Sequence, residues 1–483
     1  MSDDLDHPKE ECGVFGVVAP GRDVSRIAFF ALHAMQHRGQ ESAGIAVADN
    51  GHVLVQRDLG LVSQVFDESS LRTLTGHMGI GHVRYSTTGA NKWDNAQPVT
   101  RTGPRGIVAL GHNGNLTNTS ALRDELAAQG LALNATTDSE LIAAAIAQSS
   151  GTLLEAVAEA MPRLAGAFSV VVMSGEELVA FRDPYGVRPL VIGRLPDAGW
   201  CVASETCAFD QIGATFEREV LPGEAIRISA EGIESVQAMT NHGARLCVFE
   251  SIYFARPDSM IGERSVWDAR REMGTVLAEE SPAVADLVVG LPDSGTPAAV
   301  GFANASGIPY AEAVVRNRYV GRSFIQPEQH LRQNGVRMKF NPLRSVIGGK
   351  RLVVVDDSIV RGTTMRQIVT MLQDAGAKEV HLRISSPPIA WPCFYGIDMA
   401  TRDELIAATH TLDEICEAVG ATTLAYLSLD GLQRAIGRPA SGVCRACFTG
   451  EYPVPVPGEA LKLRFEDATV TVTAKSRPAP ASA

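Results

Sequence analysis

Two contrasting hydrophobic patterns divide the chain. Up to residue 240 the apolar runs are short: CGVFGVVA at 12–19 predicts a buried strand, and GIAVADNGHVLVQRD at 44–58 predicts two strands joined at Asn50-Gly51. Two helices are also predicted, one ending at Gly130 and one opening at Asp138, where a short side-chain oxygen can cap free amides. This part is therefore expected to form sheets packed against helices.

Beyond residue 270, strands alternate with helices. DLVVG at 286–290 precedes a loop and a helix, and KRLVVVDD at 350–357 precedes the helical pattern MRQIVTMLQDAG and then a further strand, EVHLRIS. This alternation is typical of βαβ units and predicts a doubly wound parallel sheet. The expected fold class is therefore α/β with two domains.

Length and composition agree with this division. The chain has 483 residues, and compact domains usually hold about 100 to 200 residues. The hydrophobic fraction of 45% and the charged fraction of 20% are those of an ordinary globular protein. We expect a leader at 1–11, a first domain at 12–240, a second at 241–455 and a variable tail at 456–483.

Charge and hydropathy exclude two classes of partner. A net charge of -12 argues against nonspecific binding to nucleic acid, which depends on neutralising phosphates with Lys and Arg. No apolar run approaches the roughly 18 residues that cross a bilayer, and the acidic start MSDDLDHPKEE is unlike a secretory signal. We therefore expect a cytoplasmic protein that binds neither nucleic acid nor membrane.

Cys12 stands directly before the first predicted strand. Removal of residues 1–11 would give it a free α-amine beside its own thiol, and an amine with a pKa of about 8 can take up the thiol proton. An isolated cysteine at the start of a strand is more often a small buried hydrophobic residue. A nucleophilic role for Cys12 therefore depends on the motifs downstream of it in the sequence.

Four segments come after CGVFG in order: HRGQESAGIA at 37–46, GHVRYSTTG at 81–89, GHNGNLTN at 111–118 and TTDSE at 136–140. Together with CGVFG they resemble the N-terminal nucleophile glutamine amidotransferase domain. The resemblance implies the αββα sandwich of the N-terminal nucleophile hydrolases, with Cys12 as the nucleophile that attacks glutamine.

The same resemblance assigns the other glutaminase residues. Arg84 would pair with the α-carboxylate of glutamine and Asp138 with its α-ammonium, as their charges also suggest. Asn113 and the backbone amide of Gly114 would form the oxyanion hole, because both are neutral donors that can face a developing negative charge. Because the α-amine serves as the base, the histidines of these segments are expected to be structural.

VVVDDSIVRGTT at 353–364 combines a buried strand with a helix start. The strand delivers Asp356 and Asp357 to the carboxyl edge of a parallel sheet, where open α/β folds bind ligands. The helix amides and the hydroxyls of Thr363 and Thr364 form a cradle for a phosphate. The carboxylates repel phosphate, so they should face ribose hydroxyls or a Mg²⁺ ion; a solvated Asp-Asp turn is the alternative.

This stretch resembles the phosphoribosyl pyrophosphate (PRPP) motif of type I phosphoribosyltransferases, and VVGLPDSGTP at 288–297 resembles their pyrophosphate loop. The resemblance implies a Mg²⁺ site at Ser294, Asp356 and Asp357. Further PRPP contacts are expected from Ser358, Arg361, Gly362, Thr363, Thr364 and Lys339. An Arg-rich stretch between the loops looks like a flap that closes over the site. Its candidate diphosphate ligands are Arg316, Arg318, Arg322, Arg337 and Lys339, and solvated surface charges are the alternative for several of them.

Both halves in this order resemble the amidophosphoribosyltransferase family, over residues 12–455. The resemblance implies that ammonia from glutamine passes through an internal channel to C1 of PRPP. The products would be 5-phosphoribosylamine, glutamate and pyrophosphate, in the first step of de novo purine nucleotide synthesis. A homotetramer and inhibition by purine nucleotides are implied as well.

Two other interpretations fit parts of the sequence. A different glutamine amidotransferase would share the first half but not DDSIVRGTT. A sensor that binds PRPP and keeps an inactive glutaminase domain is opposed by the intact set of Cys12, Arg84, Asn113 and Asp138.

The eight cysteines are too few for a disulfide scaffold in so long a chain. CRAC at 444–447 fits a redox pair, half of a zinc site or half of an iron-sulfur site. With Cys247 and Cys393, whose segments resemble the cluster-bearing branch of the family, Cys444 and Cys447 are expected to hold a structural [4Fe-4S] cluster. Zinc at the same residues is the alternative. The remaining three, Cys201, Cys207 and Cys416, are expected to be ordinary buried thiols.

Overall fold

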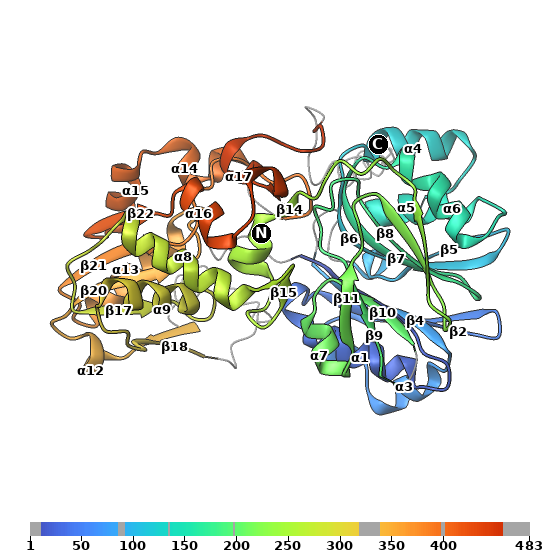
Figure 1. Ribbon diagram of the computed structural model, residues 1–483, viewed down its shortest axis with the longest axis horizontal. Helices are drawn as coiled ribbons and strands as arrows, with labels where there is room; N and C mark the ends of the chain where they lie inside the picture. Colours follow the sequence, from blue (N-terminus) through green and yellow to red (C-terminus); the bar gives the residue numbers. More distant parts are fainter. Residues whose placement is uncertain are drawn as a thin grey trace, which may run out of the picture. The chain divides into compact units, whose positions relative to one another are not determined.

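The computed structural model describes residues 11–85, 92–133, 136–196, 199–317, 339–397 and 401–456 (Figure 1). They fold into two compact units. The first contains the described residues of Glu10–Leu246, Phe394–Asp398 and Tyr452–Ala483, and the second those of Cys247–Cys393 and Met399–Glu451. The predicted leader up to residue 10, most of the predicted flap and the tail beyond residue 456 lie outside the described residues.

Two antiparallel sheets form the centre of the first unit. The seven-stranded sheet has the order β11 (Thr215–Glu219), β9 (Val191–Arg194), β10 (Trp200–Ala203), β1 (Gly13–Val18), β4 (Met78–Arg84), β2 (Ser42–Asp49), β3 (His52–Leu59). The six-stranded sheet has the order β13 (Ile233–Gln237), β12 (Glu224–Ile228), β8 (Leu178–Arg182), β7 (Gly166–Met173), β6 (Gly106–Leu116), β5 (Val99–Gly103). Apolar side chains from both sheets, among them Val14 and Val171, form one core between them.

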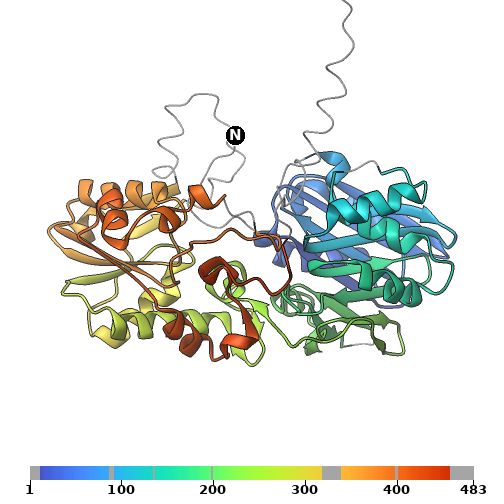
Figure 2. The same cartoon turned by 90° about the horizontal axis from the view of Figure 1, so that it is seen from above.

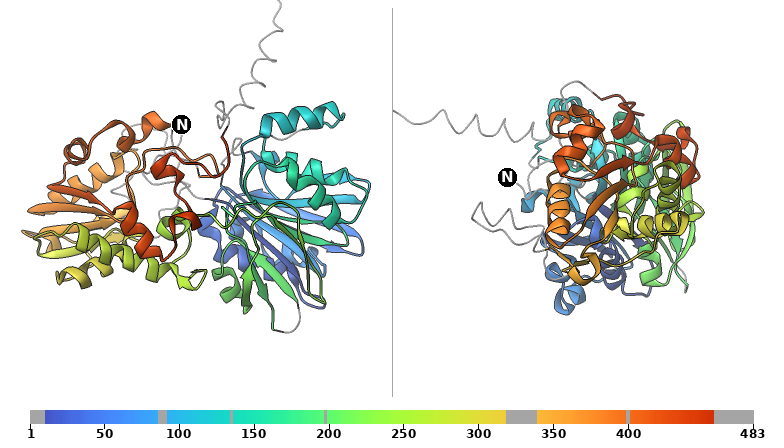
Figure 3. Two further views of the ribbon diagram at one scale, coloured as in Figure 1. Left: turned by 45° about the horizontal axis from the view of Figure 1, so that its top comes forward. Right: turned by 90° about the vertical axis from the view of Figure 1, so that its left-hand side faces the viewer.

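Helices cover the outer faces of both sheets. Helices α1 (Val24–Ala34) and α7 (Cys207–Ile212) pack on the seven-stranded sheet, where Phe15 and Val17 of β1 point away from the other sheet. Helices α4 (Thr119–Ala128), α5 (Asp138–Ala147) and α6 (Leu153–Ala160) cover the six-stranded sheet (Figure 3, left). Successive side chains of a strand face opposite ways, so each sheet serves two cores. The predicted αββα sandwich is confirmed.

The local predictions for this unit hold with one change. The β2–β3 hairpin turns at Asn50 (φ 49°) and Gly51 (φ 80°), both left-handed, as a two-residue turn requires. Helix α5 begins at Asp138, as predicted, but its N-cap residue is Thr137, which makes no capping hydrogen bond through its side chain. The carboxylate of Asp138 accepts a hydrogen bond from the amide of Leu116, which lies outside the helix.

A four-stranded parallel sheet forms the centre of the second unit, in the order β17 (Leu287–Gly290), β20 (Arg351–Asp356), β21 (Glu379–Ile384), β22 (Thr423–Tyr426). Val354 packs in one core with α13 (Thr363–Asp374) and α15 (Leu412–Val419). Helices α8 (Val266–Glu280) and α9 (Gly295–Ser306) lie on the other face, so that both faces are covered (Figure 2). The predicted doubly wound parallel sheet is confirmed.

The remaining elements are short. They are α2 (Val62–Val65), α3 (Glu68–Thr73), β14 (Leu246–Cys247), a π-helical turn (Glu250–Phe254), β15 (Met260–Ile261), β16 (Arg264–Ser265), β18 (Val314–Arg316), β19 (Phe340–Pro342), α12 (Arg344–Ile347), α14 (Ile406–Thr409), α16 (Leu429–Ile436), β23 (Val443–Cys444), α17 (Ala446–Thr449) and the 3₁₀ turns Gln36–Arg38, Trp93–Asn95, Met161–Arg163, Arg402–Glu404 and Ala440–Gly442. Among the described helices, none combines the length and apolar character that a membrane span requires.

Candidate functional site

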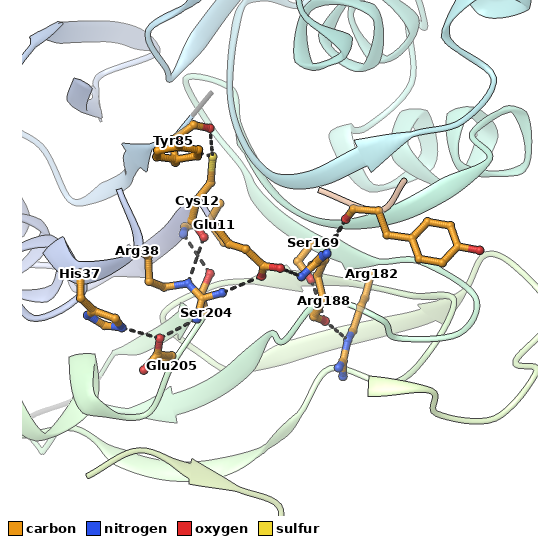
Figure 4. Close-up of polar contacts among 12 residues, drawn as sticks. Glu11, Cys12, His37, Arg38, Tyr85, Ser169, Arg182, Arg188, Ser204 and Glu205 are labelled. Atoms are coloured by element: carbon orange, nitrogen blue, oxygen red, sulfur yellow. Dashed lines mark hydrogen bonds and ion pairs between the residues drawn. The ribbon is translucent and has the colours of Figure 1, made fainter. Parts of the chain in front are cut away.

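Cys12 lies just before β1 and is 5% exposed. Its thiol donates a hydrogen bond to the carbonyl of Tyr85 at 3.3 Å and accepts one from the amide of Tyr85 at 3.5 Å (Figure 4). Burial raises the pKa of the Cys12 thiol to about 11, although the Tyr85 hydrogen bond and the charge of Arg84 oppose this rise. The thiol is therefore protonated at neutral pH and needs a base before it can act as a nucleophile.

Two buried side chains of opposite charge act on this thiol. Arg84 ends β4 and is 2% exposed, with its guanidinium 3.7 Å from the carboxylate of Glu41. Asp138 is also buried; its Oδ2 accepts the amide of Leu116 at 3.0 Å, and its Oδ1 lies 3.6 Å from Nδ1 of His112. Burial alone would raise the pKa of Asp138, but His112 and the amide hydrogen bonds hold it below its ordinary value. Asp138 is therefore ionised at neutral pH.

Asn113 and Gly114 are consecutive residues of β6, opposite Ser169 and Phe168 of β7. The side-chain Nδ2 of Asn113 is buried and has no hydrogen-bond partner among the described residues. Gly114 has a φ of 139°, and a Cβ added there would lie 2.0 Å from the carbonyl oxygen of Ala167. Only glycine fits this backbone at position 114, and the residue before it, Asn113, carries the side-chain donor that has no partner in the described part of the chain.

Besides His112, whose Nδ1 lies near Asp138, the segments contain two further histidines that make structural contacts. His82 is fully buried and bonds through Nε2 to the carbonyl of His112, and burial lowers its pKa to about 3. His82 is thus neutral in the fold and unsuited to take up a proton at neutral pH. His37 pairs through Nε2 with a carboxylate oxygen of Glu205 at 2.7 Å.

A network of buried charged residues, Arg38, Arg188 and Glu205, adjoins Glu11 and Cys12, although no motif assigned a role to any of the three (Figure 4). Arg38 bridges Glu205 and the carbonyl of Cys12, and Arg188 pairs with Glu11. The only signal in the sequence was an arginine within HRGQE and another within DPYGVRP, and neither pattern shows that the guanidinium is buried.

In the second unit, the loops after β17 and β20 leave the sheet at the same edge, because the two strands are parallel with Gly290 opposite Val355. Ser294 and Ser358 each donate to the carboxylate of Asp357, at 2.5 and 2.6 Å. The amide of Asp357 donates to Asp356 at 2.9 Å, and both acids are buried. The structure thus brings together the oxygen-bearing residues predicted for Mg²⁺.

The helix start after these acids has the predicted form. Gly362 is the N-cap of α13 with a φ of 80°, Thr363 is exposed and Thr364 is buried. Arg361 forms an ion pair with Glu404 at 2.9 Å.

The flap residues are only partly described. Arg316 forms an ion pair with Asp293, and the carbonyl of Lys339 accepts the amide of Asn317 at the base of the β18–β19 hairpin. Arg318, Arg322 and Arg337 lie outside the described residues.

The four cysteines of the predicted cluster come from three segments. Strands β14 and β23 pair, which brings Cys247 and Cys444 onto neighbouring strands. The carbonyl of Cys447 accepts hydrogen bonds from the amides of Ala390 and Trp391, two residues that shortly precede Cys393 in the sequence. Burial raises the pKa of Cys447 well above its ordinary value, and Cys444 and Cys393 raise it further.

No three His, Cys, Asp or Glu side chains in the described ranges are arranged to hold a metal ion. The ligand set of Cys247, Cys393, Cys444 and Cys447 therefore stays a prediction. Of the other thiols, Cys201 and Cys207 are buried as expected, whereas Cys416 is only half-buried.

Family models match both halves of the chain. A model described as a glutamine amidotransferase domain matches residues 82–211, and one described as a phosphoribosyl transferase domain matches residues 274–385. The first match contains Arg84, Asn113, Gly114 and Asp138, and the second contains Ser294 with the Asp356–Thr364 loop.

Curated relatives are similar over nearly the whole chain. The amidophosphoribosyltransferase of Mycobacterium tuberculosis is 55% identical over 469 residues, which span 94% of this chain and 89% of the relative. That of Synechococcus elongatus is 52% identical over 481 residues, 96% of each chain. That of Bacillus subtilis is 47% identical over 467 residues, 95% of this chain and 98% of the relative.

Solved structures of this family are also similar to the chain over most of its length. The glutamine PRPP amidotransferase from B. subtilis, complexed with ADP and GMP, has a TM-score of 0.88 at 47% identity and covers 93% of this chain and 99% of its own. A structure described as the allosteric regulatory enzyme of purine biosynthesis has a TM-score of 0.89, also at 47% identity. The chain therefore belongs to the amidophosphoribosyltransferase family, the enzymes that transfer the amide nitrogen of glutamine to PRPP in purine synthesis.

Proposed function

We propose that Cys12, freed of residues 1–11, is the nucleophile of the glutaminase reaction. Its new α-amine takes the thiol proton, and Sγ attacks the amide carbon of glutamine. Collapse of the tetrahedral intermediate passes the proton to the departing ammonia, and water then hydrolyses the thioester to glutamate. The raised pKa of Cys12 supports this scheme, since so weak an acid needs an adjacent base.

Arg84 and Asp138 bind the two charged groups of glutamine, and Asn113 with the amide of Gly114 stabilises the oxyanion. The observation that carries this assignment is the buried Nδ2 of Asn113, which has no hydrogen-bond partner among the described residues. Buried polar groups are nearly always hydrogen-bonded, so a donor that has no partner among the described residues suits a substrate oxygen that arrives only with the ligand.

PRPP binds at the shared edge of β17 and β20. Its 5-phosphate lies at the start of α13, where free helix amides favour an anion, and its ribose faces the buried acids. The residues proposed to contact it are Asp356, Asp357, Ser358, Arg361, Gly362, Thr363, Thr364 and Lys339. Ammonia attacks C1 as pyrophosphate leaves, which gives 5-phosphoribosylamine.

Ser294, Asp356 and Asp357 are proposed to hold Mg²⁺. Hydroxyl and carboxylate oxygens are the ligands that this ion prefers, and Ser294 already contacts Asp357. The ion, when bound, would neutralise charge on the departing pyrophosphate.

A [4Fe-4S] cluster at Cys247, Cys393, Cys444 and Cys447 is proposed as a structural element, with zinc as the alternative at the same residues. Its support is a donor set of suitable chemistry, drawn together by the β14–β23 pairing and the bonds to the carbonyl of Cys447. Elemental analysis of anaerobically purified protein for iron, sulfide and zinc separates the two metals. A protein free of all three contradicts both.

Three further proposals concern the regulation, the assembly and the location of the enzyme. Binding of purine nucleotides as inhibitors is supported by the B. subtilis relative, whose solved structure is complexed with ADP and GMP. A homotetramer and a cytoplasmic location follow from the family resemblance and from the composition.

The test of the proposed function measures glutamate release with and without PRPP, together with formation of 5-phosphoribosylamine. We expect PRPP to stimulate glutamate release, and Cys12→Ala to abolish it while PRPP binding by the second unit persists. Processed and folded Cys12→Ala protein that makes phosphoribosylamine from glutamine at the wild-type rate would contradict the assignment.

A further inference from the structure

Two buried arginines converge on the side chain of Glu11, the last residue of the predicted leader (Figure 4). Arg188 forms an ion pair with Oε1 of Glu11, and Nη2 of Arg38 lies 3.3 Å from Oε2. Glu11 and Arg38 are 1% exposed and Arg188 is 0% exposed. Each carboxylate oxygen thus has its own guanidinium partner away from water, where charge-assisted hydrogen bonds are strongest.

Arg38 contacts both sides of the peptide bond between Glu11 and Cys12. Besides its contact with the Glu11 carboxylate, its Nε donates to the carbonyl of Cys12 at 3.0 Å. Its Nη1 forms a further ion pair with Glu205 at 2.5 Å, which fixes the plane of the guanidinium. The Glu11 side chain and the Cys12 backbone are therefore held by one rigid group.

Arg188 is held just as firmly. Its Nε and Nη2 both donate to the carbonyl of Tyr395, at 2.8 and 2.6 Å, which leaves Nη1 directed at Glu11. Its own carbonyl accepts hydrogen bonds from the Ser169 hydroxyl at 3.1 Å and from Nε of Arg182 at 2.6 Å. The position of the Arg188 guanidinium is therefore fixed by contacts other than the one with Glu11.

These contacts can act only while the leader is attached. In the processed enzyme Glu11 is gone, and Arg188 loses the carboxylate with which it pairs in this structure. Loss of one partner from a buried ion pair is unfavourable, so the arrangement cannot be explained as stabilisation of the processed enzyme. Its effect must come before or during removal of the leader.

We propose that Arg188 and Arg38 are positioning residues for maturation, and that the Glu11 carboxylate fixes the Glu11–Cys12 peptide bond for cleavage beside the Cys12 thiol. The cleavage consumes one water molecule: the C–N bond breaks, Glu11 gains a carboxyl oxygen and Cys12 gains its α-amine. This inference rests on the proposed function, because it requires that the leader be removed.

The test compares rates of cleavage in cells by pulse labelling, chase and intact mass of the purified full chain. Glu11→Gln and Glu11→Ala are expected to slow cleavage on the order of a hundredfold, since a small misplacement of reacting groups has an effect of that size. Glu68→Gln makes the same change of charge in an exposed ion pair with Arg26 and should cleave at the wild-type rate. Because cleavage removes residue 11, the processed fraction of both Glu11 variants should match the processed wild type in glutamate release.

A double-mutant cycle separates positioning from folding. Arg188→Met should slow cleavage, Arg188→Lys should restore part of the rate, and the pair Glu11→Gln with Arg188→Met should be no slower than either change alone. Wild-type rates in both Glu11 variants, or additive effects in the cycle, overturn the positioning role and leave the proposed function intact. A wild-type protein that keeps residues 1–11 and still releases glutamate overturns the leader removal itself.

Discussion

Replacing Asn113 with alanine is the sharpest test of the glutaminase site. In the structure, Nδ2 of Asn113 is buried without a hydrogen-bond partner in the described part of the chain, so the substitution removes no hydrogen bond made by that amide. The folded protein should therefore lose little stability. The transition state, in contrast, should lose one of its two proposed oxyanion donors, which corresponds to about 3 kcal/mol, or a fall of about 100-fold to 1,000-fold in kcat.

The assay is glutamate release at saturating PRPP, with kcat and KM for glutamine determined separately and the melting temperature measured on the same sample. We expect kcat to fall and both KM and the melting temperature to stay near the wild-type values, because the role proposed for Asn113 is to stabilise charge that develops only during the reaction.

Asn115→Ala is the matched control on the same strand. Its Nδ2 donates to the carbonyl of Phe394 at 2.9 Å, so its loss should lower stability by about 1 kcal/mol and change kcat far less. An Asn113→Ala protein with unchanged kcat, or with a loss of activity that merely follows a loss of stability, would refute the oxyanion assignment.

Three further predictions concern Gly114, Asp357 and His82. Gly114→Ala should abolish glutamate release and lower the melting temperature, because φ is 139° and a Cβ would lie 2.0 Å from the Ala167 carbonyl; retained activity would contradict this. Asp357→Asn should weaken Mg²⁺-dependent PRPP binding, measured by calorimetry, while basal glutamate release persists. Burial lowers the pKa of His82 from its ordinary 6.5 to about 3 in the folded protein. Between pH 3 and pH 6.5, His82 is therefore protonated in the unfolded state and neutral in the folded state. Stability should therefore rise with pH across that window by about 1.4 kcal/mol per pH unit, and in denaturant titrations His82→Gln should lack this contribution.

Much of the fold could be predicted because its signals are local. The β2–β3 hairpin follows from Asn50-Gly51, since few other residues adopt two consecutive left-handed conformations. The β20 strand and the α13 helix follow from an apolar run and a helical period on either side of DDSIVRGTT. The start of α5 was also predicted, but its N-cap residue is Thr137, and the carboxylate of Asp138 bonds to the amide of Leu116, distant in sequence, as well as to that of Ser139 in the first turn.

The sequence by itself determined the fold class, the family and the chemical types at both candidate sites, because strand alternation, turn residues and short motifs depend only on neighbouring positions. Tertiary structure decided how charges separated by many residues combine. Glu11, Arg38 and Arg188 lie far apart along the chain, and only folding buries them together beside Cys12. Burial and pairing depend on the side chains that the rest of the chain places around a residue, which no local pattern specifies.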